Sequence, residues 1–329
     1  MTDTRSLAER VLAGDRRALA RAITLVESSR EDHRAQATEM LERLTPAGRE
    51  MGREAIRIGL SGTPGVGKST FIESFGCMLT GQGLKVAVLA VDPSSARSGG
   101  SILGDKTRME RLSRDPNAFI RPSPSQTHLG GVARRTREAI ELCEAAGFDV
   151  ILIETVGVGQ SETMVAEMAD LFVLLLAPAG GDELQGVKRG IMEMADLILV
   201  NKADGDLKPA ATRTCADYMG ALKLLRKRPQ DPPGFPKAMM VSALSEDGLE
   251  AAWDEMRALT EWRRENGHFA AARAAQARFW FAEDVRQGLL RRLESAAAKA
   301  VMEELSARVG DGEITATRAA EEALSRLGA

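Results

Sequence analysis

Cysteines are scarce in this sequence, and it contains no long apolar run. The three cysteines, Cys77, Cys143 and Cys215, lie far apart and form no CxxC pair, which excludes a disulfide framework and indicates a reducing compartment. The longest apolar run, Leu171–Ala179, is well short of the roughly 20 residues that cross a bilayer. Charged residues near the N-terminus exclude the apolar core of a signal peptide. We therefore expect a soluble, cytoplasmic protein.

An excess of charge of either sign is also lacking. The 44 basic residues are balanced by 47 acidic ones, and the net charge of −3 argues against a general electrostatic grip on nucleic acid or anionic lipid. We expect neither nucleic acid nor a membrane among the partners. With 44% hydrophobic and 28% charged residues, the chain is neither disordered nor membrane-embedded. Its 329 residues correspond to about two domains, or to one large domain with extensions.

Apolar residues recur at helical spacing over residues 1–54, which predicts a helical N-terminal extension. Asp15 is the predicted N-cap of its second helix, and Pro46-Ala47-Gly48 is predicted to break the helical pattern. No catalytic pattern occurs in this zone. We therefore expect the extension to pack on the domain that follows it.

Residues 55–265 alternate short apolar runs with segments of helical length. Nearly unbroken apolar strands between helices are typical of a parallel sheet covered on both faces, so we predict an α/β fold with a doubly wound, mostly parallel sheet. The segment 226–237 holds four prolines and is predicted to be a loop. The predicted strands are Ala55–Leu60, Lys85–Val91, Phe148–Ile153, Leu171–Ala177, Leu197–Val200 and Ala238–Val241.

Residues 266–329 are predicted to be helical again. One long helix is expected to end at Asp311-Gly312, followed by a short amphipathic helix. This segment either lies against the sheet domain or forms an arm that pairs with a second subunit. Since a protruding helix cannot bury its own apolar stripe, we favour the arm and a homodimer. The stripe of the long helix comprises Leu289, Leu293, Ala297, Val301 and Leu305.

The strongest motif is GTPGVGKS, which follows a predicted strand and precedes a helical segment. It fits the phosphate-loop pattern GxxxxGK[ST], in which glycines let backbone N–H groups surround a phosphate. A chance Gly-rich turn is the alternative, but a random match in this context is rare. Lys68 would bridge the β- and γ-phosphates, and the Ser69 hydroxyl would ligate Mg²⁺. The predicted nucleotide-binding residues are Gly62, Gly65, Val66, Gly67, Lys68, Ser69 and Thr70.

A second motif, Asn201-Lys202-Ala203-Asp204, directly follows a predicted buried strand, where a nucleotide pocket belongs in such folds. Asp204 can accept hydrogen bonds from the ring N–H and the exocyclic amine of guanine, a donor pair that adenine does not offer. Asn201 suits the other polar edge of the base, and the stem of Lys202 can cover its face. Ser242-Ala243-Leu244 follows the next strand and can reach the base with backbone N–H groups. Together with the phosphate loop, these residues predict a guanine nucleotide.

Acidic residues between the two motifs predict the metal side of the site. Glu154 ends a strand and precedes Gly157, whose N–H can sense the γ-phosphate; with Lys68, these are the predicted catalytic residues. Asp92 ends another strand, and Asp105 lies in the loop beyond it. Ordinary loop capping is the alternative for Asp92 and Asp105.

The residue after the predicted switch glycine bears on the rate of hydrolysis. Ras-type GTPases carry a Gln there, which orients the attacking water. This chain has Val158 at that position, and Gln160 follows two residues later. We therefore expect slow intrinsic hydrolysis that a partner accelerates.

Taken together, the motifs resemble those of the MeaB-type GTPases. The resemblance rests on GTPGVGKST, VDPSS, LGDKTRM, ETVGVGQSE, APAGGDELQGVKRGIME and NKAD, and it covers most of the chain, including both helical extensions. It implies a homodimeric P-loop GTPase that uses GTP, GDP and Mg²⁺. It also implies a chaperone of the adenosylcobalamin-dependent methylmalonyl-CoA mutase, which gates cofactor loading and protects the mutase from inactivation.

The resemblance also implies roles for individual residues. It places Asp92, Asp105 and Glu154 near the Mg²⁺ ion. It implies that the segment Gly180–Lys188 is an additional switch that responds to the partner. The residues of this switch are Asp182, Gln185 and Lys188.

Three other function classes compete with this interpretation. A GTPase that delivers nickel would need clustered His or Cys ligands, and the three histidines and three cysteines of this chain are scattered. A P-loop kinase would have no use for the guanine-selective NKAD motif. A membrane-targeting GTPase would carry a Met-rich signal-binding appendage, which does not follow the predicted nucleotide domain.

Two groups of residues outside the motifs are predicted to be structural. The basic pair Arg134-Arg135 is expected on a solvated helix face. Large aromatic residues near the start of the helical tail are expected to anchor packing. These residues are Trp253, Trp262, Trp280, Phe269, Phe279 and Phe281.

Overall fold

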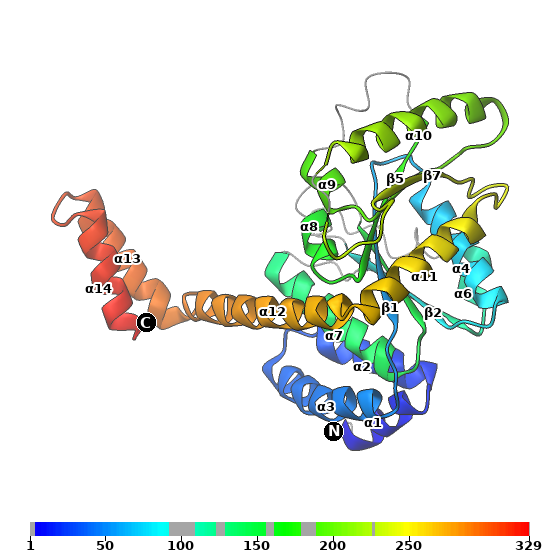
Figure 1. Ribbon diagram of the computed structural model, residues 1–329. Coiled ribbons are helices and arrows are strands. Elements are labelled where there is room, and N and C mark those ends of the chain that lie inside the picture. The colour runs from blue at the N-terminus through cyan, green and yellow to red at the C-terminus, as the bar shows by residue number, and fades with distance from the viewer. Residues whose placement is uncertain are drawn as a thin grey trace. The chain divides into compact units, whose positions relative to one another are not determined.

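The computed structural model describes residues 4–91, 109–122, 129–155, 161–178, 189–225 and 228–328. The chain divides into two compact units, Met1–Ala274 and Ala275–Ala329. Figure 1 shows the first unit as helices gathered around a sheet and the second as helices only. Within the described ranges, no helix combines the length and apolar character needed to cross a membrane.

Within its described residues, the first unit contains a seven-stranded sheet with the order β3-β2-β4-β1-β5-β6-β7. Every pair of neighbouring strands is parallel, which confirms the predicted α/β fold. The six predicted strands all form, but the edge strand β3 was missed by sequence reasoning. The strands are β1 Ile56–Ser61, β2 Val86–Val91, β3 Ala118–Arg121, β4 Val150–Thr155, β5 Leu171–Leu176, β6 Leu197–Val200 and β7 Lys237–Met240.

Helices connect successive strands and cover the sheet. Within the described ranges between residues 68 and 265, the α-helices are α4 Lys68–Gly81, α6 Glu110–Arg114, α7 Leu129–Ala145, α8 Ser161–Ala166, α9 Arg189–Met194, α10 Lys208–Lys223 and α11 Leu249–Glu265. The short 3₁₀ helix η3, Gly205–Leu207, precedes α10. The described part of the proline-rich segment 226–237 is a loop up to the start of β7, as predicted.

Alternation along β1 shows that helices lie on both faces of the sheet. Ile58 belongs to the core cluster that contains Phe71 of α4, while the neighbouring residue Gly59 faces Val165 of α8. Successive strand residues point to opposite faces, so α4 and α8 lie on opposite sides of the sheet. On the α4 side, the rings of Phe71 and Phe75 stack with centroids 5.1 Å apart. The sheet is therefore doubly wound, with an apolar core on each face.

Three helices precede the sheet: α1 Thr4–Leu12, α2 Arg16–Glu27 and α3 Glu31–Glu50. Asp15 caps α2 as predicted, because its carboxylate accepts hydrogen bonds from the N–H groups of Arg17 at 2.8 Å and Ala18 at 3.1 Å. Helices α2 and α3 pack against α7. The N-terminal extension therefore covers the sheet domain, as expected.

The predicted break at Pro46-Ala47-Gly48 was wrong, since α3 continues through Pro46 to Glu50. Gly48 is a packing residue here, and a Cβ atom at this position would lie 3.3 Å from Ala145 Cα. The missing side chain allows α3 to approach α7 closely. Burial of Met40 and Leu44 on the same helix further offsets the hydrogen bond that proline removes.

The single long helix predicted for the C-terminal segment was also wrong. Two helices occupy this stretch, α12 His268–Arg292 and α13 Ala296–Gly310. Ser295 separates them because its hydroxyl accepts a hydrogen bond from Ala298 N–H at 3.2 Å and caps α13. The predicted break at Asp311-Gly312 is confirmed, and the last helix is α14 Ala316–Leu327.

Two expectations about side chains need correction. Arg134 donates to Glu138 at 2.7 Å and Arg135 is buried, because the contacts of α7 with α2, α3 and β2 leave this part of the helix little solvent. The aromatic residues divide into two groups. Trp253, Trp280 and Phe269 are buried as expected, whereas Trp262, Phe279 and Phe281 are exposed.

Candidate functional site

The phosphate-loop motif connects β1 to α4, as the sequence predicted. A Cβ atom at Gly62 would lie 2.4 Å from the carbonyl oxygen of Leu175 on β5. Gly67 precedes α4 with a φ of +89°, and a Cβ atom there would lie 2.8 Å from Asn201 Nδ2. Both glycines are required because the backbone of the loop runs directly against neighbouring elements.

Lys68 is the first residue of α4, and its ammonium group is directed back toward the loop. Its Nζ donates a hydrogen bond to the Gly62 carbonyl at 2.6 Å. Burial lowers the pKa of Lys68, while the negative charges of Glu154 and Glu162 oppose this shift. The loop therefore holds a partly desolvated cation, which is suited to binding phosphate oxygens. Ser69 is partly buried and Thr70 is exposed in the same helical turn.

Asn201 ties the phosphate loop to the loop that follows β7. This residue is almost fully buried, at 1% exposure. Its Nδ2 donates to the Val66 carbonyl at 2.9 Å, and its Oδ1 accepts from Ala243 N–H at 3.0 Å. The first hydrogen bond uses one of the two amide hydrogens, so the other can serve a ligand.

Lys202 and Asp204 lie at the same end of the sheet. The Lys202 backbone has a φ of +58°, and its Nζ donates to the Gly65 carbonyl at 2.7 Å. The Ser242 hydroxyl donates to Oδ2 of Asp204 and accepts from Ser245 N–H at 3.1 Å. These contacts orient the Asp204 carboxylate from one side. The neighbouring Leu244 side chain is exposed.

Glu154 lies near the carboxyl end of β4, beside Leu60 on β1 in the sheet register. Its side chain is buried. The next residue, Thr155, donates a hydrogen bond to the Ser61 hydroxyl at 3.3 Å and thereby joins the ends of β4 and β1. The phosphate loop starts one residue after Ser61, so Glu154 and Lys68 belong to one site.

The donors in this site fit a hard cation such as Mg²⁺, which prefers oxygen ligands. Ser69 supplies a hydroxyl and Glu154 a carboxylate from the two adjacent segments. Asp92, Asp105 and Gly157 lie outside the described residues. Within the described ranges, no group of three or more His, Cys, Asp and Glu side chains could hold a metal ion.

The comparisons with known proteins agree with this geometry. The family model described as "Methylmalonyl Co-A mutase-associated GTPase MeaB" matches residues 19–298. The chain belongs to the MeaB family.

Two curated relatives of this MeaB-family chain cover most of its length. It is 54% identical over 286 residues to the mouse protein named "Methylmalonic aciduria type A homolog, mitochondrial", which covers 85% of this chain and 68% of the relative. It is 45% identical over 296 residues to "GTPase ArgK" of Escherichia coli, which covers 89% of this chain and 88% of the relative.

A solved structure supports the fold of the MeaB-family chain. The structure titled "Crystal structure of LAO/AO transport system kinase" superimposes with a TM-score of 0.76 at 33% identity. The match covers 100% of this chain and 99% of that one. Membership of this family makes the protein a P-loop GTPase that binds guanine nucleotide, as the two sequence motifs predicted.

The structure also brings into the MeaB-family site a residue that sequence reasoning missed. Glu162, in the first turn of α8, is buried at 1% exposure, and its charge acts on Lys68. Glu162 is the last residue of the motif ETVGVGQSE, but the sequence analysis assigned it no role. The available signals were its place in this motif and its position shortly after the predicted switch glycine. The predicted switch residues Asp182, Gln185 and Lys188 lie outside the described residues.

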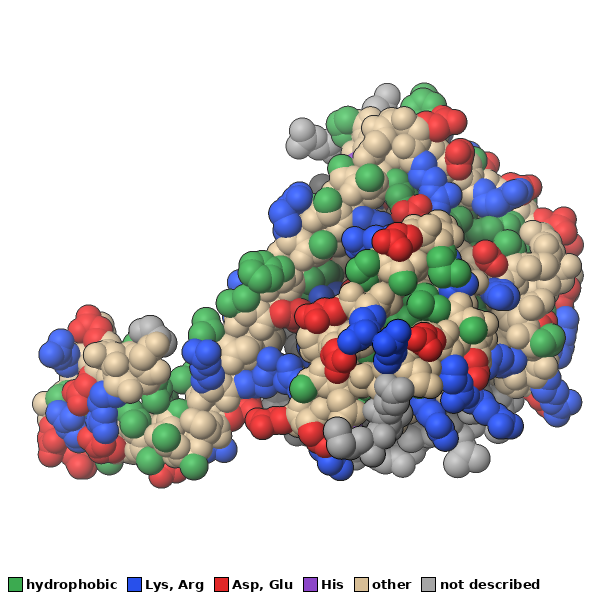
Figure 2. Space-filling model, turned by 90° about the horizontal axis from the view of Figure 1, so that it is seen from below, with side chains coloured by type: hydrophobic (Ala, Val, Ile, Leu, Met, Phe, Trp, Pro, Cys, Tyr) green, Lys and Arg blue, Asp and Glu red, His purple; other side chains and the backbone are tan. Residues whose placement is uncertain are grey.

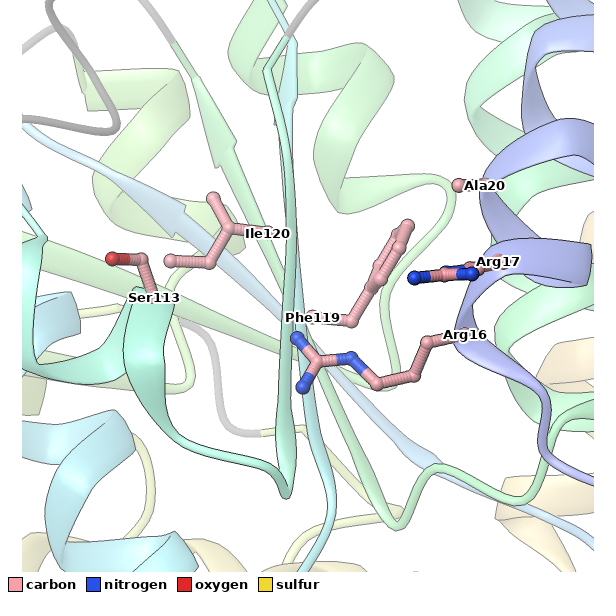
Figure 3. Close-up of a pocket in the computed structure, with 6 residues that line it drawn as sticks. All are labelled: Arg16, Arg17, Ala20, Ser113, Phe119 and Ile120. Carbon is pink, nitrogen blue, oxygen red and sulfur yellow. The ribbon is translucent and has the colours of Figure 1, made fainter.

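A cavity lies away from these loops, between α2 and β3 (Figure 3). Arg16 and Arg17 point from α2 toward the strand. The Arg16 guanidinium donates to the carbonyls of Asp115 at 3.2 Å and Pro116 at 3.4 Å, so it already serves to fasten α2 to the segment before β3. None of the predicted nucleotide-site residues lines this cavity. The lining residues are Arg16, Arg17, Ala20, Ser113, Phe119 and Ile120.

Proposed function

We propose that this protein is a GTP-dependent chaperone of the adenosylcobalamin-dependent methylmalonyl-CoA mutase, which gates cofactor loading and protects the mutase from inactivation. The observation that carries the proposal is the match to a family described as mutase-associated, which extends over residues 19–298. The relative named after methylmalonic aciduria supports the same assignment. The site supports it chemically, because it combines a phosphate loop with a motif suited to guanine.

The proposed base selectivity depends on the Asp204 carboxylate. Ser242 orients it by a hydrogen bond to Oδ2. In contact with guanine, the carboxylate accepts hydrogen bonds from the ring N–H and the exocyclic amine. With adenine it loses its hydration and gains no donor pair, and an unpaired charged group is costly. Asn201, Lys202 and the segment Ser242-Ala243-Leu244 complete the base site.

The proposed chemistry places the phosphates in the loop of Gly62–Thr70. Lys68 contacts the β- and γ-phosphates and offsets the charge that develops in the transition state, and Gly157 N–H contacts the γ-phosphate. A bound Mg²⁺ ion would supply positive charge that offsets the charge of the phosphates. Its proposed ligands are Ser69, Asp92, Asp105 and Glu154.

We further propose that hydrolysis is slow in the isolated protein and faster with the partner. Val158 occupies the position where a water-orienting Gln is found in Ras-type enzymes, which supports slow intrinsic turnover. Asp182, Gln185 and Lys188 are proposed to form the switch through which the mutase acts.

The proposed assembly is a cytoplasmic homodimer that needs neither nucleic acid nor a membrane. We assign residues 1–54 to a helical extension, 55–265 to the GTPase domain and 266–329 to a dimerisation arm. Figure 2 shows acidic and basic side chains intermingled on the visible face of the first unit, which supports the absence of a nucleic-acid surface there. Exposed Phe281 and Leu289 on α12 support the arm.

Two experiments test this function. Purification from the source organism should recover a large cobalamin-dependent isomerase together with the protein. Addition of that isomerase should increase GTP hydrolysis, and Lys188→Ala should remove the increase while leaving nucleotide affinity nearly unchanged. Equal hydrolysis with and without the mutase would reject the partner, and tight retention of Ni²⁺ after desalting would favour nickel delivery instead.

A further inference from the structure

Glu162 is a buried acid whose position is determined by the packing of α8. This helix lies on the face of the sheet opposite α4 and contacts β1, β4 and β5. A Cβ atom at Gly59 would lie only 2.8 Å from Val165 Cγ1, so the helix rests directly on the backbone of β1. Glu162 precedes Val165 by three residues and therefore lies on the same face of the helix, one turn closer to its N-terminus.

The segment after α8 is fastened at the opposite end of β1. Asp170 accepts a hydrogen bond from Arg57 N–H at 2.8 Å, and Asp170 N–H donates to the Arg57 carbonyl at 2.8 Å. Arg273 of α12 binds both oxygens of the Asp170 carboxylate, at 2.8 and 2.7 Å. With Asp170 held beside the first residues of β1 and Val165 over its middle, Glu162 lies toward the end where the phosphate loop begins.

Two buried acids lie with one partly buried lysine at that end. Glu154 and Glu162 are buried near the end of β1 where the loop begins, and their charges attract the Lys68 ammonium group, whose Nζ is held on the Gly62 carbonyl. Glu154 belongs to β4 and was predicted from the sequence, whereas Glu162 belongs to α8.

We propose that Glu162 is a positioning residue for Lys68, and that its charge makes the loop discriminate between nucleotides by competing with their phosphates for that lysine. This inference rests on the proposed assignment of Lys68 to the phosphates. GTP carries one more negative charge than GDP, so Glu162 opposes GTP more strongly. Binding of GTP draws Lys68 away from Glu162, which gives α8 a direct electrostatic link to the γ-phosphate.

Glu162→Gln tests the proposal because it removes the charge and keeps the size and polarity of the side chain. Affinities for GTP and GDP are measured by calorimetry, with Mg²⁺ and again with EDTA. We expect the ratio of GTP to GDP affinity to rise on the order of fivefold in both conditions, as removal of one nearby buried charge implies. A purely structural role would weaken both nucleotides alike and leave the ratio unchanged.

Glu167→Gln is the matched control, since it neutralises an exposed acid located just after the same helix, and its ratio should equal that of the wild type. Glu162→Asp retains the charge and should restore a ratio close to the wild-type value. A ratio unchanged in Glu162→Gln, or a loss of GTP affinity confined to the Mg²⁺ condition, overturns the proposal.

A second variant covers the case in which Glu162→Gln does not fold. Gly59→Ala keeps the charge but forces Val165, and α8 with it, away from β1, so the ratio should again rise. No rise in the folded variants overturns the inference. If wild-type protein binds ATP as tightly as GTP, the proposed function fails first; if it prefers GTP and the variants leave the ratio unchanged, only the role of Glu162 fails.

Discussion

The two units of the chain differ in how completely they bury their apolar residues. In the first unit, the sheet and its helices enclose a continuous core that includes Phe71, Phe75 and Trp253. In the second, the described core cluster is formed by Leu305, Ala319 and Ala323. Large apolar side chains remain exposed along α12–α14, and Figure 2 shows apolar groups on the surface of this segment. They are Phe279, Phe281, Val285, Leu289, Leu290, Leu293, Met302 and Leu324.

This contrast indicates that the two units have different roles. The first unit has the core needed to hold loops rigidly, and every described residue of the proposed nucleotide site belongs to it. The second unit exposes several large apolar side chains around a small described core cluster, and exposed apolar patches often mark interaction sites. We infer that nucleotide chemistry requires the first unit alone, and that the second unit serves association.

Lys68→Ala should produce the largest effect, and it tests whether GTP hydrolysis depends on a residue of the first unit. It removes the cation that offsets phosphate charge, so single-turnover GTP hydrolysis should fall by at least about 100-fold. Lys208→Ala, on the exposed first turn of α10, is the control and should hydrolyse GTP at the wild-type rate. Turnover retained in Lys68→Ala would remove Lys68 from the catalytic assignment.

Arg273→Ala should sharpen the contrast in stability. Arg273 pairs with the partly buried carboxylates Asp170 and Glu144, so its removal should lower the free energy of unfolding by about 3 kcal/mol in a denaturant titration. Arg286→Ala removes a largely exposed arginine on the same helix and should cost less than about 1 kcal/mol. An equal decrease in the free energy of unfolding in the two variants would show that the ion pairs of Arg273 contribute no more to stability than an exposed ion pair.

Asp204→Asn should change the choice of base without disturbing the fold. The amide presents a donor to a base that carries a carbonyl, so GTP affinity should fall about 30-fold and xanthine nucleotide should be preferred. A competition assay with the guanine and xanthine nucleotides measures this change in base preference. The nearby exposed variant Asp206→Asn should keep the preference for guanine; unchanged preference in Asp204→Asn would mean that another residue reads the base.

Leu289→Ser should give the smallest effect and test the second unit. If this half-exposed side chain lies in a dimer interface, its replacement should raise the dissociation constant of the dimer about tenfold in sedimentation experiments. A chain that ends at Ala274 provides the monomeric reference. GTP affinity should remain that of the full chain in both proteins. A full-length chain that sediments as a monomer would contradict the assigned role of the second unit.

Most of the fold could be predicted because its strands are short apolar runs between helical segments. Strand β3 escaped because it has four residues, ends in Arg121 and lies at the edge, where a continuous apolar run is not required. Pro46 and Gly48 are local signals of a break, but contact between α3 and α7 outweighs them. Ser295 had no local signal strong enough to divide α12 from α13. In each case, contacts between elements distant in the chain determined the structure, and local propensity did not predict it.

The phosphate loop and the NKAD motif were predictable because their chemistry requires contiguous residues. Glu162 ends the motif ETVGVGQSE, but the motif alone gave no role to it. Its proposed role depends on the packing of α8 against β1 at Gly59, which lies more than 100 positions away in sequence. The burial of Arg135 likewise depends on helices distant in the chain. Motifs therefore revealed the groups that contact a ligand directly, whereas the residues that support them became visible only through packing.

Asn201 makes the two ends of the nucleotide pocket interdependent. Its side-chain amide forms hydrogen bonds with both Val66 and Ala243. A protein that moves the base-binding loop outward would therefore also break the hydrogen bond between Asn201 and the phosphate loop. The Val66 carbonyl and the Ala243 N–H would then lack hydrogen-bond partners, and each would cost about 1–3 kcal/mol for as long as water cannot reach it. A nucleotide-exchange factor consequently has to supply substitutes for both contacts or admit water to them, and spontaneous exchange should be slow.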